Sequence, residues 1–429
     1  MARLFLSTLG TTEYSEVYYK LDDNAPYLTP FVQEALVSFL CRKWNSNDRI
    51  VIFCTEEARQ TNWISKDPGD VGEGSRKGLE DRLKALGLNA EIEMVNIPEG
   101  KSESEIMEIF SRVTEKIREQ DSVILDITHS YRSLPLLNIV VLNYAKALKK
   151  IKVERICYGA YEARKNNIAP IFDLTPYDRL LDWSLAVNEF IGYGIPDRVA
   201  ALVREDLSPI LMKKRGKDVT AASIKKLAER LCRMSQNIRS ARCFEIEKFV
   251  SLKGDVNKIK EQELIPPLNP LLDKIVEKTE GFGVESATQK GFEAVKWCME
   301  HDLLPQAYII LLETVLTGVC RKLGYDPAKK EDRNFLSALL SVVGQKKPED
   351  KWEGELKRKM EKAKEILIKC DGPFRELAKA YSKLGNHRND FMHCGCSGSP
   401  GKHETLNKKI HDLYNDVTLA WSKFDSALT

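Results

Sequence analysis

Residues 122–135 read SVILDITHSYRSLP and join an apolar segment to a helix through a polar turn. The first residues are rich in Val, Ile and Leu, which is typical of a strand buried in a parallel sheet. Polar, aromatic and cationic residues follow, and Pro135 stands where the first turn of a helix accepts proline. A buried strand that leads directly into a helix predicts one unit of an open α/β sheet.

The flanking sequence repeats this alternation of strand and helix. Short apolar segments predict parallel strands at residues 3–9, 49–55, 91–97, 122–128 and 153–158. Amphipathic segments between them predict helices at residues 30–44, 75–86, 102–118 and 135–149. The segments 156–163 and 168–174 are joined by residues 165–167 and predict a hairpin at the sheet edge. We therefore expect a doubly wound, Rossmann-like parallel sheet domain that ends near Thr175.

The sequence after Thr175 predicts helices alone. Thr175 and Pro176 are typical of an N-cap and a first helical residue. A proline-rich stretch at residues 266–270 and the turn at Gly281 divide the helical part in two. The predicted domains are residues 1–175, an all-α connector at 176–280, and a final all-α domain at 281–429.

Composition limits the class of protein. The 429 residues are 43% hydrophobic and 30% charged, with a net charge of +3, a balance typical of globular proteins. The mixed charges permit an anionic partner without requiring one. The chain starts without a basic signal-peptide segment, and no apolar run is long enough to cross a bilayer. With ten scattered cysteines, which suit reduced thiols, these features predict a cytoplasmic protein with no membrane partner.

Two polar loops, residues 7–12 and residues 126–135, each follow a predicted strand. They lie at the edge where open parallel sheets bind ligands. The helix start after the second loop attracts anions, Arg132 adds a fork of donors, and Tyr131 offers a face for stacking. We predict that a phosphate-bearing nucleotide binds at Thr8, Gly10, Thr11, Thr12, Asp126, Thr128, His129, Ser130, Tyr131 and Arg132. In the alternative interpretation Thr128 and Ser130 only cap the helix and Arg132 pairs with a carboxylate.

Two common nucleotide motifs are absent from the sequence. The glycines of residues 69–78 miss the G-x-G-x-x-G spacing because Lys77 stands where the third glycine belongs. The P-loop pattern G-x-x-x-x-G-K-[ST] is absent as well. We therefore expect a site that senses a nucleotide, with no redox cofactor.

A second candidate site lies in residues 385–396, GNHRNDFMHCGC. Arg388 and His393 diverge by about 140° on a regular helix, so they converge only at a distorted helix end or across a symmetric dimer. A guanidinium would stabilise charge on a phosphate, and an imidazole that titrates near neutrality would transfer or position a proton. We predict that Arg388, Asn389 and His393 cut RNA without a metal, by attack of a 2'-hydroxyl on the adjacent phosphorus.

Other interpretations of this segment remain open. Arg388 and His393 also suit the surface of a helix whose core face carries Phe391 and Met392. A zinc site is a second interpretation, although the usual C-x2-C spacing is absent, and its ligands would be His387, His393, Cys394, Cys396 and His403. Thiol catalysis by Cys394 is a third, for which no separate base is indicated.

Together the two sites resemble those of the CARF-HEPN ribonucleases, accessory enzymes of type III CRISPR systems. Residues 126–135, DITHSYRSLP, are similar to the CARF signature D-x-T-H-[small]-[aromatic]-R, with Ser130 where glycine is common. Arg388, Asn389 and His393 resemble the R-x4-H motif of HEPN domains. The helix at residues 306–323, with Glu313, resembles the HEPN helix that packs against the catalytic one.

The resemblance implies a homodimeric endoribonuclease that cuts single-stranded RNA. A cyclic oligoadenylate, expected to be cyclic tetra-adenylate, would bind across two CARF domains, and two HEPN domains would form one composite active site. Some CARF domains slowly cleave their activator, a reaction that would involve Thr8, Thr128 or Arg132 here. The alternative function is a non-enzymatic CARF regulator that binds nucleic acid, for which a basic helix-turn-helix would be expected. A HEPN nuclease or helical scaffold with another trigger is a third possibility.

Overall fold

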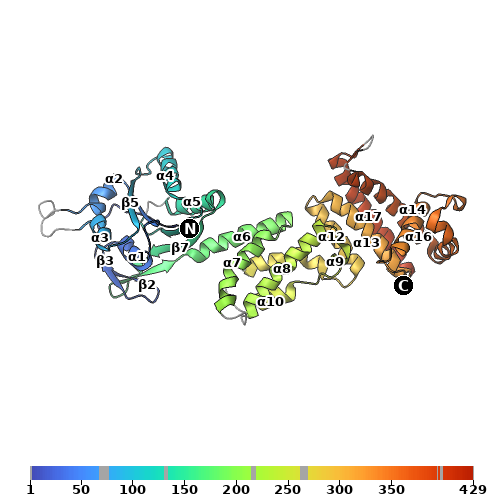
Figure 1. Ribbon diagram of the computed structural model, residues 1–429, viewed down its shortest axis with the longest axis horizontal. Coiled ribbons are helices and arrows are strands. Elements are labelled where there is room, and N and C mark those ends of the chain that lie inside the picture. The colour runs from blue at the N-terminus through green and yellow to red at the C-terminus, as the bar shows by residue number, and fades with distance from the viewer. Residues whose placement is uncertain are drawn as a thin grey trace. The chain divides into compact units, whose positions relative to one another are not determined.

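The chain divides into two compact units, Met1–Leu181 and Asp182–Thr429. The structure, a computed structural model, describes residues 2–66, 77–129, 134–213, 219–260, 269–393, 395–396 and 400–428. The first unit contains the sheet, and the described part of the second contains helices and turns (Figure 1). None of the described helices is both long enough and apolar enough to span a bilayer.

The first unit contains a mixed eight-stranded sheet. Its strands are β1 (Arg3–Thr8), β2 (Val17–Leu21), β3 (Tyr27–Thr29), β4 (Arg49–Cys54), β5 (Glu91–Asn96), β6 (Ser122–Asp126), β7 (Lys152–Gly159) and β8 (Ile168–Asp173). They lie in the order β3-β2-β8-β7-β6-β1-β4-β5. Strands β7, β6, β1, β4 and β5 are parallel to one another, which confirms the parallel part of the predicted sheet.

The predicted hairpin lies inside the sheet and not at its edge. Strands β7 and β8 are antiparallel, as expected, with Cys157 opposite Asp173. However, β2 pairs in parallel with β8, and β3 pairs antiparallel with β2. The sequence pattern did not predict β2 or β3, because β3 has three residues and β2 only five. The expected position of the hairpin at the sheet edge was therefore wrong.

Helices cover both faces of the sheet, as the alternation of elements predicted (Figure 1). One face carries α1 (Val32–Leu40) and α3 (Leu79–Ala85), and the other carries α4 (Glu103–Lys116) and α5 (Leu134–Lys149). Successive strand residues point to opposite faces, so Phe5 packs in the first core while Leu4 and Leu6 pack in the second. The short helix α2 (Glu56–Ala58) and a π-helical turn, η1 (Arg59–Trp63), follow β4.

The second unit is helical throughout its described residues. Its helices are α6 (Thr175–Tyr193), which begins in the first unit, α7 (Asp197–Lys213), α8 (Val219–Arg239), α9 (Cys243–Ile246), α10 (Lys253–Lys260), α11 (Asn269–Thr279), α12 (Ala287–Glu300), α13 (Leu304–Lys322), α14 (Lys330–Gly344), α15 (Gly354–Arg358), α16 (Met360–Met392) and α17 (His403–Ala427). The mostly helical character of this part is as predicted. The division into a connector and a final domain at residue 281 stays a prediction.

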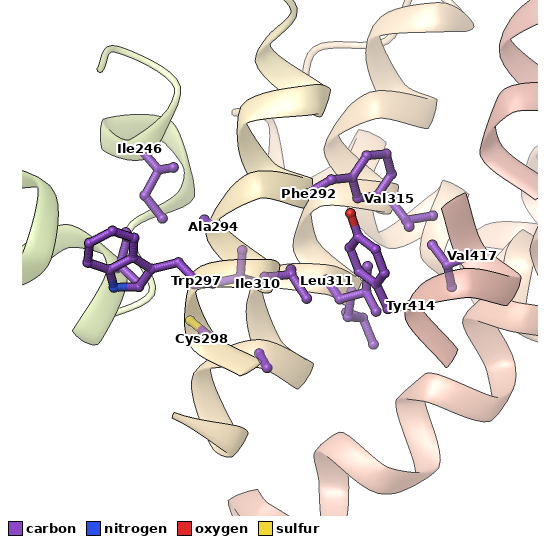
Figure 2. Close-up of a cluster of buried hydrophobic side chains, with 14 of the residues drawn as sticks. Ile246, Phe292, Ala294, Trp297, Cys298, Ile310, Leu311, Val315, Tyr414 and Val417 are labelled. Atoms are coloured by element: carbon purple, nitrogen blue, oxygen red, sulfur yellow. The ribbon is translucent and has the colours of Figure 1, made fainter. Parts of the chain in front are cut away.

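One hydrophobic core runs through the second unit. Figure 2 shows part of it, with Trp297 of α12 near Ile246 of α9 and Tyr414 of α17 on the opposite side. Glycine lets these helices approach closely, because a Cβ at Gly291 of α12 would lie 2.3 Å from the Oγ1 of Thr314 on α13. The tight packing of α12, α13 and α17 supports the end of α16, where the second candidate site lies.

Candidate functional site

The loops after β1 and β6 are neighbours because these two parallel strands pair directly. The Asp126 carboxylate joins them, since it accepts hydrogen bonds from Ser7 Oγ (2.7 Å), from the Thr128 backbone N–H (3.0 Å) and from Thr128 Oγ1 (2.5 Å). Asp126 is 1% exposed, and burial raises its pKa. A carboxylate with this burial holds the loops in place, so we assign Asp126 a positioning role within the predicted site.

Thr128 extends this network to a third strand. Its Oγ1 accepts a hydrogen bond of 2.7 Å from the backbone N–H of Gly159, the last residue of β7. A Cβ at Gly159 would lie 2.5 Å from the Cγ2 of Val32 on α1 and 3.3 Å from Thr128 Oγ1. The sequence pattern did not indicate Gly159, because its contacts are with residues far along the chain. The close packing leaves no room for a larger residue at this position.

Asn62 fixes the backbone of the Gly10–Thr12 turn. Its side-chain Nδ2 donates hydrogen bonds to the carbonyl oxygens of Gly10 (2.9 Å) and Thr12 (2.8 Å). Asn62 is 2% exposed and lies in η1, a π-helical turn of the kind that is often found at functional sites. No sequence signal indicated Asn62, which is 52 residues from Gly10. The predicted ligand turn is therefore held from the β4 side of the sheet.

His129 contacts the first loop through Tyr14. The two rings stack with centroids 4.4 Å apart, and a Cβ at Gly10 would lie 2.3 Å from Tyr14 Oη and 3.5 Å from His129 Cβ. The Nε2 atom of His129 is buried without a hydrogen-bond partner among the described residues. Burial lowers the pKa of His129 to about 4. The imidazole is therefore neutral at pH 7 and supplies an uncharged nitrogen next to the predicted ligand turn.

The neutral state of His129 predicts a pH-dependent stability. The unfolded chain binds a proton near the ordinary pKa of 6.5, whereas the folded chain binds it only near pH 4, so the free energy of unfolding should fall as the pH falls through this range. The loss attributable to His129 should reach about 3 kcal/mol. Urea unfolding of the parent and His129→Gln should give a difference that shrinks by this amount between pH 7 and pH 4. The exposed His411 of α17 provides a control, His411→Gln, and a pH-independent difference for His129→Gln would contradict the prediction.

The other predicted ligand residues are half-buried or exposed, or they lie outside the described residues. Thr8 and Thr11 are half-buried, and Thr12 is exposed. Ser130, Tyr131 and Arg132 lie outside the described residues, so the anion-binding part of the site stays a prediction. The structure does bring the two loops together, since Gly10 lies against His129.

The second candidate site lies at the C-terminal end of α16. This helix bends at Cys370 (φ −145°, ψ 36°), three residues before Pro373, and Met392 is its last residue. His393 is the C-cap residue (φ −100°, ψ 15°), and its backbone N–H donates to the carbonyl oxygen of Asn389 at 3.0 Å. Arg388 thus lies within the helix and His393 at its end, and the convergence of the two side chains stays a prediction.

Arg388 and His393 differ in exposure. Arg388 is half-buried, whereas Asn389 and His393 are exposed. Within the described part of the chain, the Arg388 guanidinium makes no hydrogen bond or ion pair. A partly exposed guanidinium without a protein partner is available to an anion, which is compatible with an anion-binding role.

Helix α13, which contains Glu313, packs against α16 near its C-terminal end. The sequence predicted this contact for the helix at residues 306–323. The Tyr308 ring of α13 lies 5.9 Å from the His387 ring and 5.2 Å from the Phe391 ring, centroid to centroid. Tyr308 also donates from its hydroxyl to the carbonyl oxygen of Leu406 on α17 (2.8 Å). Phe391 packs against the core, but Met392 is 57% exposed, so the alternative interpretation that put both on the core face is wrong for Met392.

The zinc interpretation gains no support from the described residues. Among them, no three His, Cys, Asp or Glu side chains gather as metal ligands. His403 instead lies with its Nε2 3.4 Å from Asp302 Oδ1. Cys394, which both the zinc and the thiol interpretations need, lies outside the described residues.

Two segments of the chain match models of known protein families. Residues 4–164 match the CARF domain of the CRISPR system endoribonuclease Csx1. Residues 179–281 match the second domain of the CRISPR-associated protein MJ1674.

A curated relative agrees with these matches. The chain is 25% identical over 391 residues to CRISPR-associated protein MJ1674 from Methanocaldococcus jannaschii. The similarity covers 79% of this chain and 57% of that protein, so the chain spans little more than half the length of this relative. The loops after β1 and β6 thus lie within the residues that match the Csx1 CARF domain, in a chain that is similar to a CRISPR-associated protein.

Proposed function

We propose that this protein is a metal-independent endoribonuclease that cuts single-stranded RNA when a cyclic oligoadenylate binds its CARF domain. The observation that carries the proposal is the half-buried Arg388, which has no partner among the described residues and lies just before the exposed His393. A guanidinium in this state is available to a phosphodiester, which it binds through two parallel hydrogen bonds. The Csx1-type CARF domain supports the link to a CRISPR nucleotide signal.

The proposed reaction needs only groups of the RNA and of the protein. The 2'-oxygen forms a bond to the adjacent phosphorus while the bond from phosphorus to the 5'-oxygen breaks, which leaves a cyclic phosphate and a free 5'-hydroxyl. Arg388 stabilises the charge that develops on the non-bridging oxygens. His393 holds or transfers the proton that passes from the 2'-hydroxyl to the leaving oxygen.

A homodimer is part of the proposal. Helix α5 follows the loop after β6 and exposes Ile139, Val140, Tyr144 and Leu148, each at least 44% accessible. Residues 140, 144 and 148 are four apart and lie on one side of the helix. An exposed apolar patch of this kind is typical of a protein contact surface. A second copy on this surface would place two ligand turns close enough to share one cyclic ligand.

Activation requires that the ligand bind the cutting arrangement more tightly than the resting one. The network of Asp126, Thr128 and Gly159 ties the ligand turn to three strands, so a ligand that moves this turn also acts on the strands. This connection supports a sensing role for the site.

The test is incubation of the full chain with labelled single-stranded RNA in excess EDTA, with and without cyclic oligoadenylates of different ring sizes. We expect cleavage only with a cyclic oligoadenylate, and the ring size that works identifies the activator. Retention of DNA without RNA cleavage would instead favour the nucleic-acid-binding regulator. Cleavage that ignores every ring would contradict the proposed trigger, and chromatography of the nucleotide after incubation shows whether the CARF domain consumes it.

Replacement of Asn62 tests the ligand turn. Asn62→Asp should weaken activator binding by about tenfold or more, because a carboxylate would face the carbonyl oxygens of Gly10 and Thr12 that Asn62 now binds. Asn24→Asp is the matched control, since Asn24 Nδ2 donates to the carbonyl oxygen of Leu21 (2.9 Å) in another turn of the same unit. Calorimetry with the active ring should show the loss for Asn62→Asp alone. Equal affinities for the two variants would contradict a role for Asn62.

A further inference from the structure

A polar cluster in the second unit joins α13 to α14. Arg333 of α14 forms an ion pair with Glu313 of α13 through its Nη2 atom. Its Nη1 atom donates to Thr317 Oγ1 (3.1 Å) and to the carbonyl oxygen of Pro327 (3.3 Å). The Arg333 guanidinium is therefore held by three acceptors, and Glu313 has a cationic partner.

Tyr381 of α16 connects this cluster to Arg388. Tyr381 is 4% exposed, and its hydroxyl hydrogen-bonds with Ser337 Oγ of α14 (3.0 Å). On a regular helix, positions 381 and 388 differ by about 20° after two turns, so both side chains lie on the same side of α16. Long helical side chains lean toward the N-terminus, which directs Arg388 toward Tyr381.

Three charged side chains of this region affect the pKa of the Tyr381 hydroxyl group. Burial raises the pKa of Tyr381, the hydrogen bond with Ser337 lowers it, and the charge of Glu313 raises it while those of Arg333 and Arg388 lower it. One carboxylate and two guanidinium groups therefore lie near a single phenol. Only Arg333 is paired with the carboxylate, and Arg388 has no partner among the described residues.

We propose that Arg333 holds Glu313 and thereby keeps Arg388 free to bind the phosphate of RNA, an inference that rests on the proposed function. If Arg333 were lost, Arg388 would be the remaining guanidinium among the charges that act on Tyr381 together with Glu313. A Glu313–Arg388 ion pair would occupy the guanidinium fork that the phosphate needs. Arg333 is thus a positioning residue that acts through Glu313, without touching the substrate.

The test compares activator-dependent RNA cleavage by four full-length proteins: the parent, Arg333→Met, Glu313→Gln and the double variant. Arg333→Met should lower kcat by about tenfold or more, because Glu313 then pairs with Arg388. Glu313→Gln removes the competing charge and should keep kcat within about threefold of the parent, and the double variant should return to the same range. The activator concentration for half-maximal cleavage should not change in any of them.

Arg321→Met is the matched control. Arg321 forms two hydrogen bonds with Glu247 (3.0 and 2.6 Å), so its loss breaks an ion pair of the same kind within the same unit. This variant should cut RNA like the parent. Thermal unfolding of all variants separates a folding defect from the proposed effect.

Three results would overturn the inference. One is an equal loss of kcat on Arg333→Met whether residue 313 is Glu or Gln. Another is a loss of about tenfold in Glu313→Gln alone, which would give Glu313 a direct role. The third is a double variant that does not reach parental cleavage. This comparison decides the question if Arg333→Met alone does not fold. A parent that cuts no RNA with any ring would overturn the proposed function itself, and the inference with it.

Discussion

His393→Ala should lower activator-dependent RNA cleavage by about a thousandfold while leaving cyclic oligoadenylate binding unchanged. His393 is exposed at the end of α16, so its replacement removes no core contact and should not change the melting temperature. The second unit would retain its fold, and the CARF domain would retain its ligand. A loss of cutting without a loss of binding is therefore the signature of a group that acts in the cutting step and not in activator binding.

Arg388→Ala should have a similarly large effect, since it removes the charge that we propose stabilises the phosphate. His403→Ala is the matched histidine control, because His403 is exposed, pairs with Asp302 and belongs to the zinc interpretation. Its cleavage should equal that of the parent, and a large loss there would favour zinc instead. A His393→Ala protein that cuts at the parental rate in EDTA would refute the proposed catalytic site.

Asp126→Ala should abolish activation at ligand concentrations that saturate the parent. Three donors, Ser7 Oγ and the backbone N–H and Oγ1 of Thr128, would lose their buried acceptor. Loss of three hydrogen bonds to a buried carboxyl group should lower the free energy of unfolding of the first unit by about 2–4 kcal/mol. The loops after β1 and β6 would no longer be joined, so activator binding should weaken by about a hundredfold.

Asp121→Ala provides a control for the loss of stability in Asp126→Ala. Asp121 is also 1% exposed and pairs with Arg49 at 2.7 Å, but it precedes β6 whereas Asp126 ends it. This variant should lose stability yet bind the activator as the parent does. Calorimetry with the active ring and urea unfolding of both variants make the comparison. Equal weakening of binding in the two variants would show that Asp126 acts only through stability.

Local sequence patterns predicted part of the sheet and missed part of it. The apolar segments of β1, β4 and β6 are strong signals because these parallel strands are buried on both faces. Strands β5 and β7 were predicted as well, although they are more exposed. Strand β2 alternates buried and exposed residues over only five positions, VYYKL, which is too short a pattern to be distinctive. Its pairing with β8 moved the predicted hairpin from the edge to the interior of the sheet.

The same distinction applies to the candidate sites. The turn after β6 was identifiable because many polar and aromatic residues follow one apolar strand. Asn62 and Gly159 were not, since their roles depend on contacts with Gly10 and Thr128 that only folding creates. Arg333 likewise has no local signal, and the relation to Arg388 that we propose depends on the packing of α13, α14 and α16.

The amino-acid sequence by itself determined which segments become buried strands or helices and which turns carry polar chemistry. These properties depend on neighbours within a few residues, and hydrophobic periodicity and turn residues report them directly. Tertiary structure decided that Asp126 faces inward, that Asn62 holds the ligand turn, and that Arg333 and not Arg388 pairs with Glu313. Hydrogen bonds and ion pairs between distant residues form only after the hydrophobic cores have brought their elements together.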